Sequence, residues 1–232
     1  MHLVKVPYLK AADIENSALE LLALYGEWRG CPVEPPIDVD EIAEGYLELS
    51  LEIEDLRTRL GIADVLGATW FDDRLIRIDR HLEGKEGRFA FTLAHEIGHW
   101  RLHRPLLQMQ KLVLSLFPSR EGVAATPAFV CRTSERRSPA EWQADRFAAC
   151  LLMPSNAMRA VGQRMLGDQP VAAVEGLDQS RCAGQLPQQL RTLAGDFMAN
   201  GDFTNVSNEA MCYRLLDLGM VEDALAHRQR LF

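Results

Sequence analysis

Several features that would identify a class of protein are missing from this sequence. No apolar run in its 232 residues approaches the roughly 20 residues that a membrane-spanning helix needs, so we expect no transmembrane segment. The N-terminal residues contain no apolar core followed by a small-residue cleavage site, which excludes a secretory signal peptide. The sequence also contains no internal repeat and no low-complexity segment.

Cysteine is scarce and scattered. The five cysteines are odd in number, and none belongs to a C-x-x-C pair. This pattern gives no disulfide framework and excludes a zinc site built from cysteines. It indicates a reducing, cytoplasmic compartment.

Positive charge is also in short supply. The chain has 25 Lys and Arg against 33 Asp and Glu, a net charge of −8, and it would be repelled by phosphate backbones. Residues 188–224 are predicted to form two helices that could mimic a helix-turn-helix, but they hold two basic and six acidic residues. We therefore expect no direct binding to nucleic acid. The oligomeric state cannot be read from the sequence.

Apolar residues make up 47% of the chain, enough for a compact domain with a small appendage. Helical periodicity predicts helices at 11–26, 40–47, 86–103, 139–153, from 155 onwards, and at roughly 188–200 and 207–218. Alternating or β-rich runs predict strands at 47–55, 68–71, 75–79 and 128–132, the middle two forming a hairpin. Helices with a small, mostly antiparallel sheet make an α+β domain.

The stretch FTLAHEIGHWRLH, residues 91–103, has two histidines four residues apart. On a helix, His95 and His99 lie about 40° apart around the axis and about 6 Å apart along it, so both can bind one metal ion. Glu96 can then reach a water on that metal without being a ligand. This H-E-x-x-H arrangement is typical of zinc metallopeptidases, in which the metal acidifies the water and the glutamate takes its proton. The alternative is a pair of ordinary histidines near a helix surface.

Two neighbours of this motif carry expectations of their own. Gly98 is costly inside a helix, which favours a close backbone contact there. His103 lies about 12 Å along the axis from His95 on a straight helix, too far to share its metal. We interpret His103 as a residue that either supports the ligands from behind or lies at the surface, and as a candidate contact to the substrate or its oxyanion. Arg132 and Tyr46 are further candidates for the oxyanion.

A catalytic zinc needs three protein ligands and one open position. Glu141, in SPAEWQADRFAAC, is the best candidate for the third ligand, with Asp72 and Asp73 as weaker alternatives. Asp145 lies one turn after Glu141 on the same face, where it could hydrogen-bond the outer nitrogen of a ligating histidine. The same sequence reads as a capping box, in which Glu141 would bond the backbone N–H of Ser138 instead. Zinc ligation is favoured because the histidine pair otherwise lacks a third ligand. Two His and one Glu would also accept Mn²⁺.

These two motifs together resemble the ImmA/IrrE family of metallopeptidases. The resemblance rests on RFAFTLAHEIGHWRLH and EWQADRFAACLLMP, and RLIRID, PIDVDEIAE and FTNVSNEAMCYRLLDLGMV fit as well. It covers roughly residues 12–224. It implies a gluzincin-like, zincin-type fold with His95, His99 and Glu141 as zinc ligands and Glu96 as the catalytic base.

The resemblance also implies a function, namely the cytoplasmic cleavage of a DNA-binding repressor of the XRE helix-turn-helix type. Such cleavage would derepress phage, mobile-element or stress genes. The resemblance gives neither the particular substrate nor the trigger. On this view, residues 1–160 form the metallopeptidase domain, 161–187 a loop or linker, and 188–232 a helix-turn-helix-like extension packed on the domain.

Two other functions stay open at this point. A metal-binding regulatory module could sequester a repressor or a toxin/antitoxin partner without proteolysis. A transcription regulator could act through the C-terminal helices, although their charge is unfavourable for this.

Overall fold

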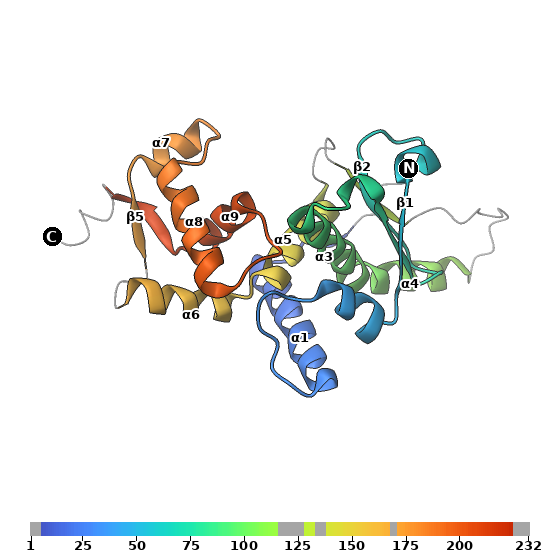
Figure 1. The fold of residues 1–232 in the computed structure, drawn as a ribbon. Helices are drawn as coiled ribbons and strands as arrows, with labels where there is room; N and C mark the ends of the chain where they lie inside the picture. Colours follow the sequence, from blue (N-terminus) through green and yellow to red (C-terminus); the bar gives the residue numbers. More distant parts are fainter. Residues whose placement is uncertain (1–5, 116–127, 133–137, 168–170, 225–232) are drawn as a thin grey trace. The chain divides into compact units, whose positions relative to one another are not determined.

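The structure is a computed structural model, which describes residues 6–115, 128–132, 138–167 and 171–224 (Figure 1). The chain divides into two compact units. The first comprises Met1–Val33 and Asp38–Leu151, and the second comprises Glu34–Ile37 and Leu152–Phe232. The chain combines many helices with small sheets, which is compatible with the α+β class. Within the described residues, no helix is both long and apolar enough to cross a membrane.

The first unit contains a four-stranded sheet with the order β1-β3-β2-β4. Its strands are β1 (Ser50–Glu54), β2 (Val65–Trp70), β3 (Leu75–Asp79) and β4 (Phe129–Arg132). β2 and β3 form the predicted hairpin, and β4 is antiparallel to β2, while β1 is parallel to β3. The sheet is therefore small and mixed, with two antiparallel pairings and one parallel pairing among its described strands.

The positions of the strands in the sheet could not be read from their sequences. β1 pairs only with β3 in the described chain, so it lies at an edge, and Ile53 is 42% exposed. The alternation of apolar residues in 47–55 predicts a strand with one buried face, but this face is buried only at Leu49 and becomes exposed at Ile53. β3 is paired on both sides, by β1 and β2, and has no free edge.

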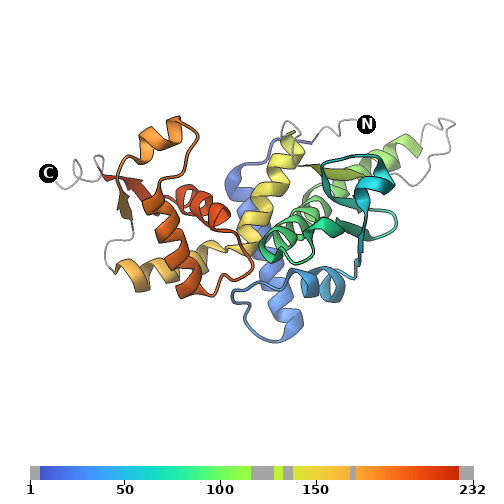
Figure 2. The same ribbon diagram turned by 45° about the horizontal axis from the view of Figure 1, so that its top comes forward.

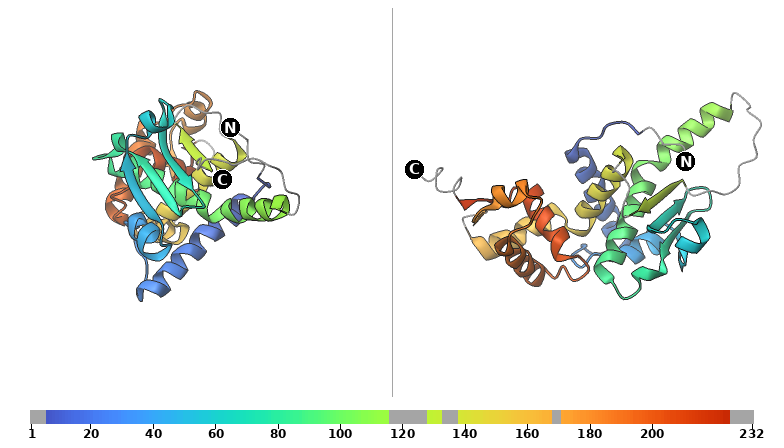
Figure 3. Two further views of the ribbon diagram at one scale, coloured as in Figure 1. Left: turned by 90° about the vertical axis from the view of Figure 1, so that its right-hand side faces the viewer. Right: turned by 90° about the horizontal axis from the view of Figure 1, so that it is seen from above.

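The described residues of the first unit contain seven helical segments, of which the four at 11–29, 41–46, 86–102 and 139–152 correspond to predicted helices. They are α1 (Ala11–Arg29), the π-helix η1 (Glu41–Tyr46), α2 (Leu56–Leu60), the 3-10 helix η2 (Arg80–Leu82), α3 (Glu86–Leu102), α4 (Arg104–Ser115) and α5 (Pro139–Leu152). The predicted stop at Gly26 is wrong, because α1 continues to Gly30, whose φ of 76° provides a left-handed cap. α3 ends before Pro105 as expected, and α4 then leads away from the sheet (Figure 3).

The sheet has two buried faces with different roles. Residues that alternate along β2 and β4, Ala68, Trp70 and Val130, join an apolar cluster with Leu56 of α2. The opposite face of β2, β3 and β4 packs against α3. This layer arrangement places the histidine motif between the sheet and α5.

The second unit is built around helices. Its elements are α6 (Ser155–Leu166), β5 (Ala172–Val174), α7 (Leu177–Cys182), α8 (Gln188–Gly201), α9 (Asn208–Asp217) and β6 (Val221–Asp223). The predicted pair α8 and α9 packs together, as Figure 2 shows. β5 and β6 form a parallel two-stranded sheet.

The reading of residues 161–187 as a loop is incorrect, since this stretch holds the end of α6, β5 and α7. β5 is short, and its partner strand lies far away in the sequence, so no local pattern revealed it. The observed division falls at 151/152, before α6 rather than within it. Residues 225–232 of the predicted extension lie outside the described part.

Candidate metal centre

The functional side chains of α3 are unusually buried for polar groups. His95 is 1% exposed, and Glu96 and His99 are fully buried. Their helix is held by apolar neighbours, Leu93 and Ile97, that are themselves fully buried. Because buried polar groups need partners, the contacts of these three residues define what the site can do.

Three ligand atoms converge beside α3. His95 Nε2 and His99 Nε2 are 2.9 Å apart. A carboxylate oxygen of Glu141 lies 3.2 Å from His95 Nε2, and its other oxygen lies 3.4 Å from His99 Nε2. In a tetrahedral zinc site with bonds near 2.0–2.1 Å, neighbouring ligand atoms are about 3.3 Å apart. The donor set and its spacing therefore fit a divalent metal.

The position of Glu141 decides between the two interpretations of SPAE. The Ser138 hydroxyl accepts a hydrogen bond from the Glu141 backbone N–H over 3.3 Å, so Ser138 does cap α5. The Glu141 carboxylate, however, faces His95 and His99. Only half of the capping box forms, and the carboxylate is available as a third ligand.

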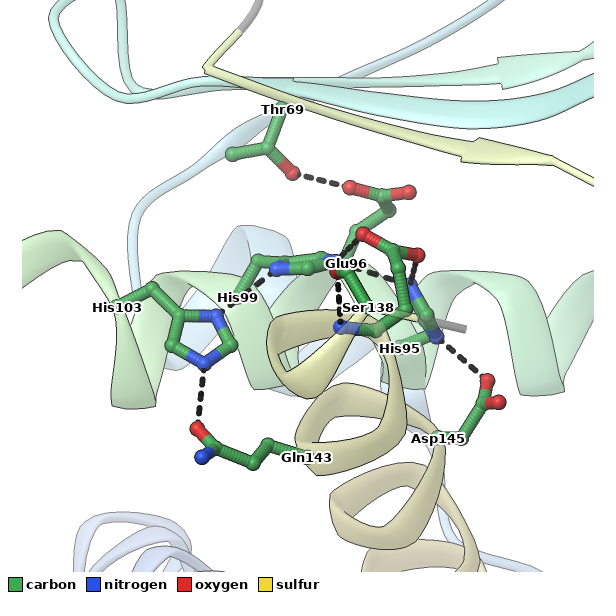
Figure 4. A network of polar contacts seen from close by, with 9 residues as sticks. Thr69, His95, Glu96, His99, His103, Ser138, Gln143 and Asp145 are labelled. Atoms are coloured by element: carbon green, nitrogen blue, oxygen red, sulfur yellow. Dashed lines mark hydrogen bonds and ion pairs between the residues drawn. The ribbon is translucent and has the colours of Figure 1, made fainter. Parts of the chain in front are cut away.

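Asp145 supports the first histidine from the next turn of α5. Its Oδ1 lies 2.9 Å from His95 Nδ1 (Figure 4). If His95 Nδ1 donates to this carboxylate, Nε2 keeps its lone pair for the metal. This is the geometry expected from the one-turn spacing of Glu141 and Asp145.

His103 lies behind the second histidine. It is fully buried, with Nδ1 at 2.9 Å from His99 Nδ1 and Nε2 at 3.0 Å from Gln143 Oε1. Both nitrogens are engaged, so His103 lies outside the ligand set and supports His99, and its contact to substrate or oxyanion stays a prediction. Gln143 was not anticipated, since a glutamine between two acidic residues of a helix gives no sequence signal.

Four residues of the sheet, two on β2 and two on β4, lie against the histidine motif of α3. Gly67 and Thr69 on β2 pair in register with Cys131 and Phe129 on β4. The Phe129 ring stacks on His99, with ring centroids 4.1 Å apart. The Thr69 hydroxyl donates a hydrogen bond to Glu96 Oε2 over 2.6 Å.

Gly67 lets Glu96 approach the sheet. A Cβ at this position would lie 2.8 Å from Glu96 Oε1 and 2.9 Å from Thr92 Cγ2. Among the described residues, Glu96 Oε1 is a buried oxygen without a hydrogen-bond partner. One carboxylate oxygen is thus held by Thr69, and the other is left for a reacting group.

The charges in the pocket favour a cation. Burial alone would lower the pKa of His95, but the neighbouring Cys131, Asp145 and Glu141 raise it well above its usual value. Burial alone would raise the pKa of Glu141, but its contacts with His95 and His99 hold it well below its usual value. The carboxylates of Asp145 and Glu141, which favour a proton on His95, would also attract a metal ion.

Burial sets the protonation of the two other groups. It lowers the pKa of His99 to about 3, which keeps this ring neutral, as a metal ligand must be. It raises the pKa of Glu96 to about 7, against the opposing effects of His95 and Thr69.

Cys131 is a residue that the sequence did not point to. Ligand atoms of His95, Cys131 and Glu141 lie within 4.8 Å of one another, so these residues form a second candidate donor set. Sulfur and nitrogen ligands of one tetrahedral zinc would be about 3.5 Å apart, and burial raises the pKa of the Cys131 thiol. The tighter spacing of His95, His99 and Glu141 favours that set.

The remaining candidates lie elsewhere in the first unit. Asp72 and Asp73 are exposed in the turn between β2 and β3. Tyr46 packs edge-on against Tyr25. Arg132 directly follows Cys131 on β4 and remains a candidate for the oxyanion contact.

Comparison with known proteins adds no name to this site. No family model matches the chain, and no curated protein matches it.

Proposed function

We propose that this chain is a zinc-dependent endopeptidase of the gluzincin type. The observation that carries the proposal is the convergence of His95, His99 and Glu141 at 2.9–3.4 Å, next to the buried carboxylate of Glu96. Zinc is preferred over manganese as the physiological metal because imidazole donors outnumber carboxylates in the set.

The chain's own residues supply the proton transfers of peptide hydrolysis. Zinc held by His95, His99 and Glu141 would act as a Lewis acid that polarises the scissile carbonyl and acidifies water. Glu96 is held through Oε2 by Thr69, and its Oε1 accepts a proton from the attacking water. Glu96 then gives this proton to the leaving amine nitrogen as the carbon–nitrogen bond breaks.

The sheet offers a place for the substrate backbone. An extended peptide can add to a sheet only at a free edge. β3 is paired on both sides, whereas β4 pairs only with β2 among the described strands. Of the two edge strands β1 and β4, β4 carries Phe129, which stacks on His99, so β4 is the one that would align a substrate beside the metal centre.

The proposed substrate is a cytoplasmic helix-turn-helix repressor of the XRE type. This choice rests on the resemblance of the two motifs to the ImmA/IrrE family. The net charge of −8 supports it, because an acidic enzyme attracts a basic DNA-binding protein. None of the five cysteines forms a disulfide bond, which is compatible with a reducing compartment.

Metal content is the first measurement. The wild-type chain should purify with one equivalent of zinc, and Glu141→Ala should lose it or hold it loosely. Equal zinc in both proteins would remove Glu141 from the ligand set. If neither protein binds zinc, even when zinc is supplied, the proposal is contradicted.

Cleavage is tested with purified helix-turn-helix repressors of the XRE type, beginning with one encoded beside the chain's own gene if the genome holds one. Intact-mass analysis should find two fragments with the wild type. Glu96→Gln should retain zinc and cleave about 100 to 10,000 times more slowly, since it cannot take up the proton. A Glu96→Gln variant that relieves repression fully without fragments would instead support sequestration by a non-proteolytic module.

A further inference from the structure

A chain of hydrogen bonds leads from the metal centre to the backbone near the N-terminus. His99 Nδ1 lies 2.9 Å from His103 Nδ1, and His103 Nε2 lies 3.0 Å from Gln143 Oε1. Gln143 Nε2 donates to the Pro7 carbonyl over 2.8 Å. The three side chains are at most 1% exposed, so water does not compete for these contacts. Figure 4 shows the His103 ring between His99 and Gln143, with a dashed contact to each.

At Pro7, the end of this series of hydrogen bonds, the direction from donor to acceptor is fixed. A backbone carbonyl can only accept a hydrogen bond, so the Gln143 amide must turn its NH₂ group towards Pro7. Its oxygen then faces His103 Nε2 and needs a donor there. His103 Nε2 therefore carries a hydrogen.

The polarity continues through both histidines. A buried ring that contacts only neutral groups stays neutral, so His103 Nδ1 keeps its lone pair and accepts from His99 Nδ1. His99 Nδ1 then carries the hydrogen, and His99 Nε2 keeps its lone pair. That nitrogen is the one that lies 2.9 Å from His95 Nε2 and 3.4 Å from the Glu141 carboxylate.

We propose that His103 and Gln143 are positioning residues that fix the tautomer of His99, with the Pro7 carbonyl setting the direction of the relay. This inference rests on the proposed metal site. It gives the two ligating histidines different supports: His95 has a carboxylate, Asp145, and His99 has a neutral relay. The relay orients His99 without adding a second buried negative charge.

Three variants separate this role from simple packing. His103→Phe keeps a ring but removes both nitrogens, and Gln143→Leu removes the acceptor and the donor. His103→Gln can still accept from His99 and donate to Gln143. Loss of the hydrogen-bonding partner of a ligating histidine typically weakens metal binding about 10- to 100-fold. We expect this loss for His103→Phe and Gln143→Leu, and a smaller one for His103→Gln.

Two readouts test the proposal in the full-length chain. Zinc affinity is measured by competition with a chromophoric chelator, and the ¹⁵N shifts of the labelled His99 ring report its tautomer in the metal-free protein. In the wild type, the His99 ring should carry its hydrogen on Nδ1. In His103→Phe and in Gln143→Leu, it should show a mixture of tautomers. The melting temperature of the metal-free variants confirms that each one is folded.

The outcomes distinguish the relay from the metal site. Wild-type affinity and an unchanged His99 spectrum in the folded variants would overturn the relay. A wild-type chain that shows the Nδ1–H tautomer but binds no zinc would support the relay and contradict the proposed function. A wild-type His99 with its hydrogen on Nε2 would overturn the relay whatever the metal content.

Discussion

At the scale of single residues, the Thr69 hydroxyl determines which oxygen of Glu96 is free. Thr69 bonds Oε2 over 2.6 Å in a fully buried setting. Thr69→Val keeps the shape but leaves a buried carboxylate oxygen without its donor. We expect a loss of about 1–3 kcal/mol in the free energy of unfolding, together with slower cleavage.

Thr69→Ser is the matched control for this prediction. It retains the hydroxyl and should recover most of the cleavage rate. Denaturant unfolding and cleavage kinetics would be measured for both variants. If Thr69→Val matched the wild type in both, the hydrogen bond would have no part in holding Glu96.

Cys131 belongs to a second candidate donor set, with His95 and Glu141, whose ligand atoms all lie within 4.8 Å of one another. We expect Cys131 to stay outside the ligand set, since His95, His99 and Glu141 are closer together. Cobalt-substituted wild type should then lack a thiolate-to-metal charge-transfer band, and Cys131→Ser should bind cobalt with unchanged affinity. A band that disappears in Cys131→Ser would instead make the sulfur a ligand.

At the scale of elements, the site depends on how closely α5 approaches α3. They meet at Gly98, where an added Cβ would lie 3.2 Å from Ala144 Cα and 3.3 Å from the Ala144 carbonyl oxygen. These are backbone atoms, so they cannot turn aside. Gly98→Ala should push the helices apart, separate Glu141 from the histidines and weaken zinc binding at least tenfold.

Gly195→Ala provides the control for that substitution. Gly195 is also inside a helix, α8, but the only atom near its added Cβ is 3.8 Å away. Replacing a helical glycine with alanine should stabilise the protein by about 0.5–1 kcal/mol and leave zinc affinity alone. Chelator competition on both variants would compare the effects, and equal zinc affinity in the two would contradict the close-contact argument.

Local sequence patterns explain why the residues that α3 and α5 contribute to the site were predictable. The spacing of His95 and His99 follows from helix geometry, and the spacing of Glu141 and Asp145 follows from it too. Even Gly98 signalled a close contact, because its cost in a helix requires a reason. By contrast, Phe129 and Cys131 reach the site through pairing of β4 with β2, about 60 residues earlier in the chain, which no local pattern encodes.

The same limit explains the errors in the fold. β1 was expected to have a buried face because its residues alternate, but alternation does not tell an edge strand from a central one. β5 was missed because only its pairing with β6 makes it a strand. Long-range pairing, rather than local propensity, decides both cases.

At the scale of the whole molecule, the proposed ligands all belong to one unit. His95, His99 and Glu141 lie in the unit that ends at Leu151, and α8 and α9 lie in the other. A metal that binds only the folded site stabilises it by RT ln(1 + [M]/Kd), about 4 kcal/mol at a thousandfold excess over Kd. Zinc should therefore slow amide hydrogen exchange in α3 and α5 and leave exchange in α8 and α9 unchanged.

Mass spectrometry with and without zinc would measure this difference, and added EDTA should reverse it. Equal protection of all four helices would mean that the units open together, and no protection of α3 or α5 would mean that no metal binds between them.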